Sequence, residues 1–340
     1  MNPRSLLSLC LALVFLVSSI HTLSCTFENG TRHDYIIALR LPGGTPRLMW
    51  RFDTTSKNWK KLGSADGGEE FLSKLLGQIH PTTHNYVAFN DEAPEGNGSK
   101  GSDSTAHAKG VLAWDPKKGE GFYLLHSVPG FPHFSKTKGF GYVTPEGSNY
   151  GQHYLCLTLK SEDHVTYLRK MFAYENAHVY IDNFDPLEQL SETRRTLLKK
   201  IAIKAAGDET VSKELVWGWT MITKPKADES LLWDASIAPE YNDDFAVKSW
   251  GRPASTSHCR SALKVSNVSS IGFNKDTQWD DTNDHSKWGI SVKKKIVCIA
   301  DMNRMDSQAN RGGSALCIDN ATVHAGFKEI IASDECKLIG

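Results

Sequence analysis

Residues 107–115, HAKGVLAWD, and residues 285–293, HSKWGISVK, share one pattern. Each segment begins with His-x-Lys and continues into an apolar run of the kind that forms a β-strand. One His-x-Lys is a common chance occurrence, but two copies in similar contexts are not. The repeat therefore predicts a fold with two related halves, each of which supplies one histidine and one lysine to a common site.

The two copies also match further along the chain. His126 lies 17 residues after Lys109, and Asn303 lies 16 residues after Lys287. Each half thus offers a His-x-Lys and, one hairpin later, a second polar group that can donate a hydrogen bond. We expect His126 and Asn303 to support a bound anion.

A phosphate group explains why a histidine and a lysine should point the same way. Side chains two positions apart share one face of a strand, and two cations there need an anion between them. In phosphodiester cleavage without a metal, lysines hold the nonbridging oxygens, one neutral histidine attacks phosphorus, and a protonated histidine donates to the leaving oxygen. The alternative interpretation is two exposed strand starts with ordinary polar residues.

The N-terminus predicts export from the cytosol. Residues 1–24 combine Arg4, the apolar run 6–17 and a small polar segment before Cys25, as a secretory signal peptide does. No later apolar run is long enough to span a membrane. The mature chain is therefore expected to be luminal or secreted.

Cysteines and sequons agree with this route. Six cysteines follow the signal peptide, an even number that favours three disulfides, and no pair has the CxxC spacing of a zinc site. The four sequons predict glycosylation at Asn29, Asn97, Asn267 and Asn320.

The charge of the mature chain depends strongly on pH. Without the signal peptide the chain has 38 Lys and Arg against 39 Asp and Glu, a net charge of −1. Protonating its 12 histidines would bring that charge to +11. In an acidic compartment such a protein would attract polyanions, whereas histidines merely scattered over the surface would give the same count.

Strand and helix patterns alternate along the chain, which predicts mixed α/β layers. An amphipathic helix is expected at 69–80, a helix capped by Ser161 at 162–173, a long helix at 187–206 and a short one at 322–332. Strands are expected in the first half at 34–42, 85–91, 109–115, 121–132 and 153–160, and in the second half at 213–222, 245–250, 261–265, 269–273, 287–292 and 294–303.

The chain resembles the deoxyribonuclease II family, whose active site is similar to that of the phospholipase D superfamily. The similarity covers nearly the whole mature chain. It is carried by DYIIALRLP (34–42), YVAFNDEAP (86–94), HAKGVL (107–112), LLHSVPGFP (124–132), YGQHYLCLTL (150–159), DDTNDHSKWGIS (280–291) and CIADMNRMDSQANRGGSALC (298–317).

The resemblance implies an α/β fold in which two phospholipase D-like halves, 25–160 and 161–340, form a pseudodimer with the active site between them. It implies an acid, metal-independent endodeoxyribonuclease that leaves 3′-phosphate and 5′-hydroxyl ends and needs no cofactor. The catalytic residues would be His107, Lys109, His285 and Lys287, with His126 and Asn303 as phosphate ligands. The implied disulfides are Cys25–Cys156, Cys259–Cys336 and Cys298–Cys317.

Several points stay open at this stage. Either histidine could be the nucleophile, with His285 the first choice, and the carboxylates that orient the histidines are not identified, because Asp115 lies one residue later than the superfamily pattern requires. Arg304 and Arg311 could contact the DNA backbone or be ordinary surface residues. The destination could be lysosomal or extracellular, and the oligomeric state is open.

Two other functions fit parts of the pattern. A nuclease-inactive secreted protein of the same fold would bind nucleic acid without cutting it, although both His-x-Lys pairs are intact. A phospholipase D-like lipid enzyme would share the chemistry, but the sequence has no apolar run suited to membrane docking.

Overall fold

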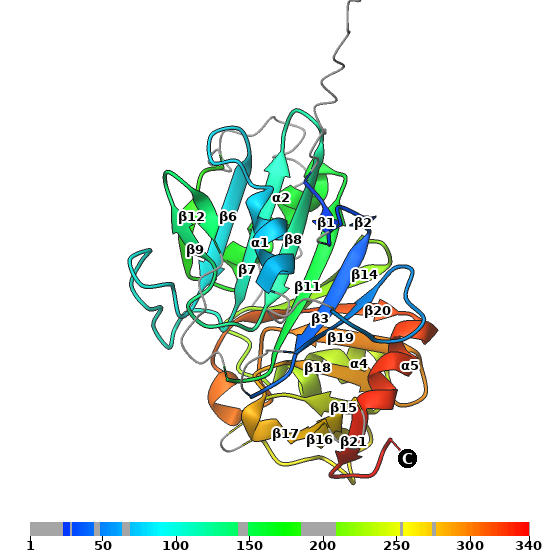
Figure 1. Ribbon diagram of the computed structural model, residues 1–340. Helices are drawn as coiled ribbons and strands as arrows, with labels where there is room; N and C mark the ends of the chain where they lie inside the picture. Colours follow the sequence, from blue (N-terminus) through cyan, green and yellow to red (C-terminus); the bar gives the residue numbers. More distant parts are fainter. Residues whose placement is uncertain are drawn as a thin grey trace, which may run out of the picture.

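The computed structural model describes residues 23–27, 29–43, 48–62, 69–141, 149–184, 209–251, 254–273 and 277–339. These residues form two large sheets with few helices, which confirms the mixed α/β class (Figure 1). The long helix expected at 187–206 and the signal peptide lie outside the described residues. Among the described residues, no helix has both the length and the apolar character needed to cross a membrane.

The first sheet has eight strands. They are β3 (Tyr35–Arg40), β4 (Met49–Asp53), β5 (Lys60–Lys61), β6 (Asn85–Asn90), β7 (Lys109–Asp115), β8 (Glu120–His126), β11 (Gln152–Leu159) and β12 (Val179–Asp182). Their order in the sheet is β12-β6-β7-β8-β11-β3-β4-β5, with antiparallel neighbours throughout. Because β12 pairs with β6, the first sheet continues beyond the boundary expected at residue 160.

The second sheet has nine strands. They are β13 (Val211–Val216), β14 (Trp219–Lys224), β15 (Phe245–Lys248), β16 (Val265–Gly272), β17 (Gln278–Asp280), β18 (Trp288–Ser291), β19 (Ile296–Ala300), β20 (Gly313–Asp319) and β21 (Ile331–Asp334). The order is β13-β14-β20-β19-β18-β15-β16-β17, and β21 also pairs with β16. Two small two-stranded sheets join β1 (Cys25–Thr26) to β2 (Arg32–His33), and β9 (His133–Ser135) to β10 (Gly139–Gly141).

The described helices are short. They are α1 (Glu69–Gly77), α2 (Glu162–Tyr174), α4 (Ala238–Tyr241), α5 (Ala321–Ile330), a π-helical turn (Leu232–Ile237) and 3₁₀ turns at Asp281–Asn283 and Asp306–Gln308. Helix α2 begins as expected, because Ser161 accepts a hydrogen bond from the Asp163 N–H at 3.2 Å. Most expected strands are confirmed, and the segment expected as one strand at 213–222 is the β13–β14 hairpin.

Alternate side chains of the central strands enter different cores. In β7, Val111 and Ala113 pack with α1 on the outer face of the first sheet. Helix α1 lies in front of β7 and β8 in Figure 1. Leu112 instead faces the core between the two sheets, which also contains apolar residues of α2 and α5. A third core covers the far face of the second sheet. Because the middle core packs the two sheets against each other, the strand starts that carry the His-x-Lys segments are held at a fixed separation.

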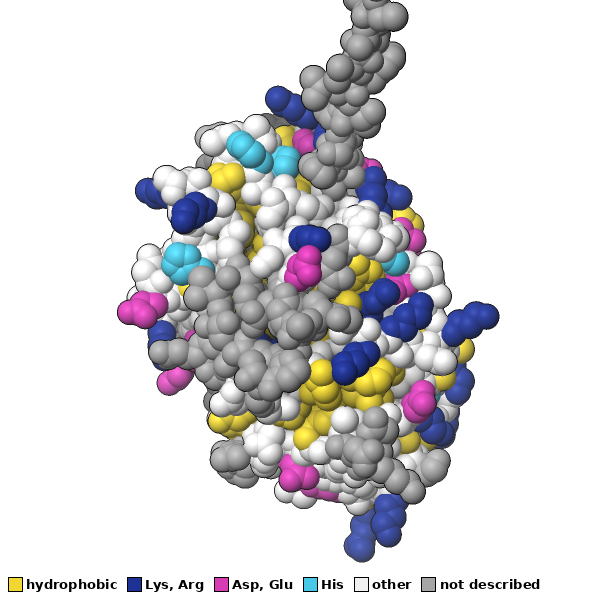
Figure 2. All heavy atoms as spheres, viewed as in Figure 1, with side chains coloured by type: hydrophobic (Ala, Val, Ile, Leu, Met, Phe, Trp, Pro, Cys, Tyr) yellow, Lys and Arg dark blue, Asp and Glu magenta, His cyan; other side chains and the backbone are white. Residues whose placement is uncertain are grey.

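The junction of the two sheets reaches the surface. Figure 2 shows hydrophobic side chains at the level where the sheets meet, with lysine and arginine side chains around them. One contact across this junction is the stack of Trp50 from β4 on Phe273, which follows β16, with ring centroids 4.3 Å apart. The two sheets therefore share packing at the rim as well as in the core.

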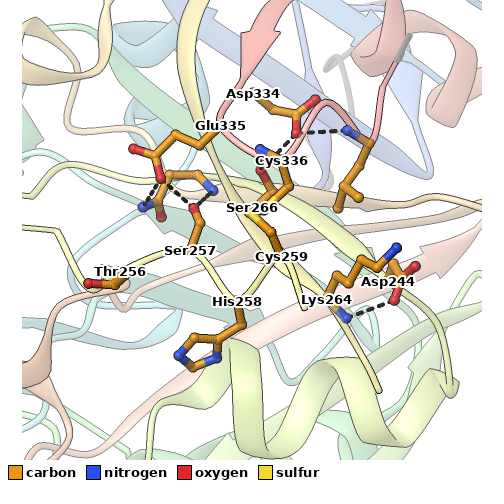
Figure 3. The surroundings of a disulfide bond; sticks show 12 residues. Asp244, Thr256, Ser257, His258, Cys259, Lys264, Ser266, Asp334, Glu335 and Cys336 are labelled. Carbon is orange, nitrogen blue, oxygen red and sulfur yellow. Dashed lines mark hydrogen bonds between the residues drawn. A yellow bond between two sulfur atoms is a disulfide. The ribbon is translucent and has the colours of Figure 1, made fainter. Parts of the chain in front are cut away.

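Three disulfides link distant parts of the chain. Cys25–Cys156 joins β1 to β11, and Cys298–Cys317 joins β19 to β20. Cys259–Cys336 fastens the C-terminal segment, where Ser266 donates to Asp334 and Ser257 donates to Glu335 (Figure 3). These pairs are the ones that the resemblance implies.

Candidate active site

Both His-x-Lys segments open onto one cavity of about 510 Å³. Lys109 is the first residue of β7 in the first sheet, and Lys287 directly precedes β18 in the second. The cavity wall contains all four residues expected to be catalytic, together with Asp91, Ser127, Trp250, Asn303 and Arg311 among others. Two segments 178 residues apart in sequence thus meet at one site.

Each histidine is held by the opposite sheet through its main chain. The His107 N–H donates to the Gly312 carbonyl at 3.0 Å, just before β20. The His285 N–H donates to the Gly151 carbonyl at 2.8 Å, just before β11. The positions of the two imidazoles are therefore coupled to the packing of the two sheets.

The ring of His107 has a defined hydrogen-bond partner. Its Nδ1 lies 2.8 Å from the main-chain oxygen of Asp301. A carbonyl oxygen only accepts, so Nδ1 carries the proton and Nε2 of the neutral ring keeps a lone pair. Burial holds the pKa of His107 well below its usual value, and Lys109, Lys287 and Arg311 lower it further against the opposing effect of Asp91. The lowered pKa favours the neutral form of His107.

The ring of His285 is held by aromatic contacts. It stacks on Tyr150 with centroids 4.3 Å apart and leans against Trp250 at 5.2 Å. Burial, and then the charge of Lys287, lowers the pKa of His285 to about 3, whereas Asp284 opposes this shift. An anion entering the cavity would favour the protonated ring.

The two lysines differ in their partners. Lys109 forms a buried ion pair with Asp91, which also binds Arg311 at 2.9 Å. Within the described residues, no carboxylate forms an ion pair with Lys287, whose Nζ donates to the His285 carbonyl at 2.8 Å. Burial, and then the charge of Lys109, lowers the pKa of Lys287 to about 7. Lys287 is therefore a buried cation for which a phosphate would be a favourable partner.

His126 and Asn303 do not occupy equivalent positions. Asn303 lines the cavity, but His126 lies buried behind its wall, where Nδ1 accepts from the Val128 N–H at 3.2 Å. In the register of the strands, His126 lies beside Lys109 of β7, and Ala300 lies beside Lys287, which precedes β18. Ala300, and not Asn303, is therefore the counterpart of His126. The similar spacing in sequence therefore does not reflect equivalent places in the fold.

Several residues at the site have no strong sequence signal. Asp91 follows β6, Asp301 follows β19, and Glu175 ends α2. Burial raises the pKa of Asp301 to about 7 and that of Glu175 well above its usual value, and the charge of Asp301 raises the pKa of Glu175 further. In the sequence, the only signal for Asp91 and Asp301 is that each follows an apolar strand segment. The sequence around Glu175 contains no local signal for a role at the site.

Two of the open points are settled by contacts. Asp115 accepts from the turn amides of Lys117 and Lys118 and lies 3.6 Å from His84, away from the cavity wall. Arg304 does not offer its side chain to DNA, because that side chain is fully buried and forms a bidentate ion pair with Asp234 at 2.9 and 2.7 Å. Its role is structural, whereas Arg311 does reach the cavity.

The four sequon asparagines differ in exposure. Asn29 is exposed, and Asn320 caps α5 through its side-chain oxygen. Asn97 is half-buried, and its amide exchanges two hydrogen bonds with the main chain of Phe134. Asn267 is buried in β16, where its nitrogen donates to Ser255 and its oxygen accepts from Arg304. Glycosylation at Asn267 stays a prediction, which this packing disfavours.

Paired histidines and lysines that meet in one cavity have the chemistry expected of a hydrolase that cleaves phosphodiesters. The chain belongs to the deoxyribonuclease II family, because the family model for Deoxyribonuclease II matches residues 24–336. Deoxyribonuclease-2-alpha of Rattus norvegicus is 25% identical, over 97% of this chain and 98% of the relative. Cell-death-related nuclease 7 of Caenorhabditis elegans is 29% identical, over 93% and 88%, and Plancitoxin-1 of Acanthaster planci is 31% identical, over 74% and 70%.

Proposed function

We propose that the protein is an acid endodeoxyribonuclease that cleaves DNA phosphodiesters without a metal and leaves 3′-phosphate and 5′-hydroxyl ends. The observation that carries this proposal is the convergence of both His-x-Lys segments on one cavity. Membership of a deoxyribonuclease family supports DNA as the substrate. The cations Lys109, Lys287 and Arg311 at the cavity supply the charge stabilisation that a metal supplies in other nucleases.

His107 is the nucleophile in this proposal, in place of the first choice from sequence. Its Nδ1 donates to the Asp301 carbonyl, so the lone pair of Nε2 is available to attack phosphorus. Attack forms an Nε2–P bond and breaks the bond to the 5′-oxygen. The strand that ends in the 3′-phosphate is then covalently attached to His107.

His285 is the proton donor. In its protonated form it delivers a proton to the departing 5′-oxygen, and the neutral ring then accepts a proton from the water that attacks the Nε2–P bond. That second step releases the 3′-phosphate and restores both histidines. Lys109, Lys287 and Asn303 are positioned at the wall to hold nonbridging oxygens, and His126 as a phosphate ligand stays a prediction.

The two sheets support the proposal of a pseudodimer. The antiparallel run β6-β7-β8-β11 has a counterpart in β15-β18-β19-β20, and a helix, α2 or α5, follows the last strand of each. The lysine of each His-x-Lys stands at the start of the second strand of its run. Since β12 belongs to the first sheet, we place the division between the halves after residue 184 rather than at 160.

The cellular destination rests on the N-terminus and on the acid chemistry. A signal-like segment and three disulfides support entry into the secretory pathway. An enzyme that needs a protonated histidine fits a lysosome or an acidic secretion.

Plasmid cleavage in EDTA tests the proposal. We expect nicking at pH 5 that exceeds nicking at pH 7, survives the chelator, and falls by at least about 10³-fold in His107→Ala and in His285→Ala. The matched control is His80→Ala, an exposed histidine away from the cavity, which should cut normally. Loss of cutting in EDTA would indicate a metal enzyme, and binding without cutting would indicate a nucleic-acid-binding protein.

A further inference from the structure

The loop that carries His285 is built around one buried carboxylate. Asp284 is 2% exposed, and both of its carboxylate oxygens are occupied. Oδ1 accepts from the Ser286 N–H at 2.7 Å, and Oδ2 accepts from Trp279 Nε1 at 2.8 Å. The side chain of Asp284 thus links Ser286, which follows His285, to Trp279 in β17, the strand before the loop.

The main chain around Asp284 is fastened to the first sheet. The Gly151 N–H donates to the Asn283 carbonyl at 2.9 Å, and the Gly151 carbonyl accepts from the His285 N–H at 2.8 Å. A Cβ on Gly151 would lie 2.6 Å from Oδ1 of Asp284. The carboxylate of Asp284 therefore lies directly against Gly151, whose carbonyl accepts the hydrogen bond from the His285 N–H.

A buried lysine completes the arrangement from the second sheet. Lys248, fully buried at the end of β15, donates from Nζ to the Asp284 carbonyl at 3.0 Å. Asp284 is thereby fixed by groups from β15, β17 and the start of β11, on both sheets. None of these partners lines the cavity, whereas His285 does.

We propose that Asp284 is a positioning residue for His285, which holds the imidazole where it can protonate the leaving oxygen. The inference rests on the proposed function, in which His285 acts on that oxygen. Asp284 itself does not line the cavity and touches no reacting atom. Its effect on cleavage must therefore pass through His285.

A double-mutant cycle tests this dependence. Asp284→Ala should lower DNA cleavage about 100-fold, the effect of a misplacement of about 1 Å. In the His285→Ala background the same substitution should cause little further loss, because the group through which it acts is already absent. A further loss as large as in the wild-type background would overturn the proposal.

The leaving group supplies a readout that a general packing defect would not change. Thymidine 3′-(4-nitrophenyl phosphate) releases a phenolate that needs no proton, so Asp284→Ala and His285→Ala should both retain most of the first-turnover rate of phenolate release, which precedes the attack of water on the Nε2–P bond. Equal losses on this ester and on DNA in Asp284→Ala alone would overturn the positioning role. Equal losses on both substrates in His285→Ala would instead refute the proton-donor part of the proposed function, and the double-mutant cycle would still decide on Asp284.

Two further variants guard against misfolding. Trp279→Phe removes one hydrogen bond from Oδ2 and keeps an aromatic ring, so it should show a smaller loss with the same dependence on the leaving group. Asp280→Ala is the matched control, because that carboxylate is exposed and nearby on the same segment. Normal cleavage of both substrates by folded Asp284→Ala and Trp279→Phe would also overturn the proposal.

Discussion

The two histidines of the site need different protonation states in the proposed mechanism, although both come from a His-x-Lys motif. In the proposed mechanism His107 must be neutral to attack, and burial keeps its pKa well below the usual value. His285 must be protonated, but its pKa is lowered to about 3 in the free protein. Acid conditions therefore help the second histidine without inactivating the first.

This difference predicts the pH dependence of kcat/KM. Above the pKa of His285, each unit of falling pH raises its protonated fraction about tenfold. Between pH 7 and pH 5 we expect kcat/KM to rise steeply, and protonation of Lys287 below its pKa of about 7 adds to the effect. Initial rates on a labelled duplex across this range measure it, and a flat profile or a rise toward alkaline pH would contradict the assignment.

The contacts of Arg304 in the structure differ from the DNA contact that the sequence allows. It looked like a possible backbone contact but is a buried anchor, bonded to Asp234, to Asn267 and to the carbonyls of Ser255 and Thr256. Truncation would leave these groups without their partner. Arg304→Ala should therefore lower the free energy of unfolding by about 3–5 kcal/mol, measured by urea denaturation.

The control for this prediction is Arg260→Ala, since Arg260 is exposed. It should change the free energy of unfolding by less than about 0.5 kcal/mol. If Arg304→Ala were as stable as the wild type yet bound DNA poorly, the structural role would be wrong.

At the scale of elements, the starts of β20 and β11 determine where the histidines sit. Gly312 accepts from the His107 N–H, and a Cβ there would lie 2.0 Å from the Glu175 carbonyl at the end of α2. Glu175 in turn accepts a short hydrogen bond from Ser314 in β20. The end of α2 and the start of β20 therefore leave no room for a side chain at residue 312.

Gly312→Ala should accordingly displace the His107 main chain. We expect DNA cleavage to fall about 100-fold and the melting temperature to drop. Gly141→Ala, where a Cβ would meet nothing within 4 Å, is the matched control and should change neither quantity. Full activity in Gly312→Ala would show that the glycine contact does not position the histidine.

At the scale of the whole molecule, local patterns predicted the elements well but not the contacts between them. The apolar run of β7 and the Ser161 cap of α2 are local signals, and both were confirmed. The repeated His-x-Lys predicted that two distant segments share one site, because the proposed chemistry needs two histidines and each segment supplies one. The structure brings all four residues to one cavity.

The remainder depends on long-range pairing that no local pattern contains. The pairing of β12 with β6, the burial of Asn267 beside Arg304, and the carboxylates Asp301 and Glu175 all involve partners far away in sequence. Spacing also misled the comparison of His126 with Asn303, because strand register, not the number of intervening residues, sets equivalence. These features needed the three-dimensional arrangement.

In the proposed mechanism His107 attacks phosphorus and His285 donates the proton, and trapping the covalent intermediate would identify the nucleophile. A single turnover on DNA at pH 5, quenched in alkali to preserve phosphohistidine, is followed by mass spectrometry of the peptides. We predict an adduct on His107 that is absent in His107→Ala. An adduct on His285, or cleavage by His107→Ala at the wild-type rate, would show that His107 is not the nucleophile.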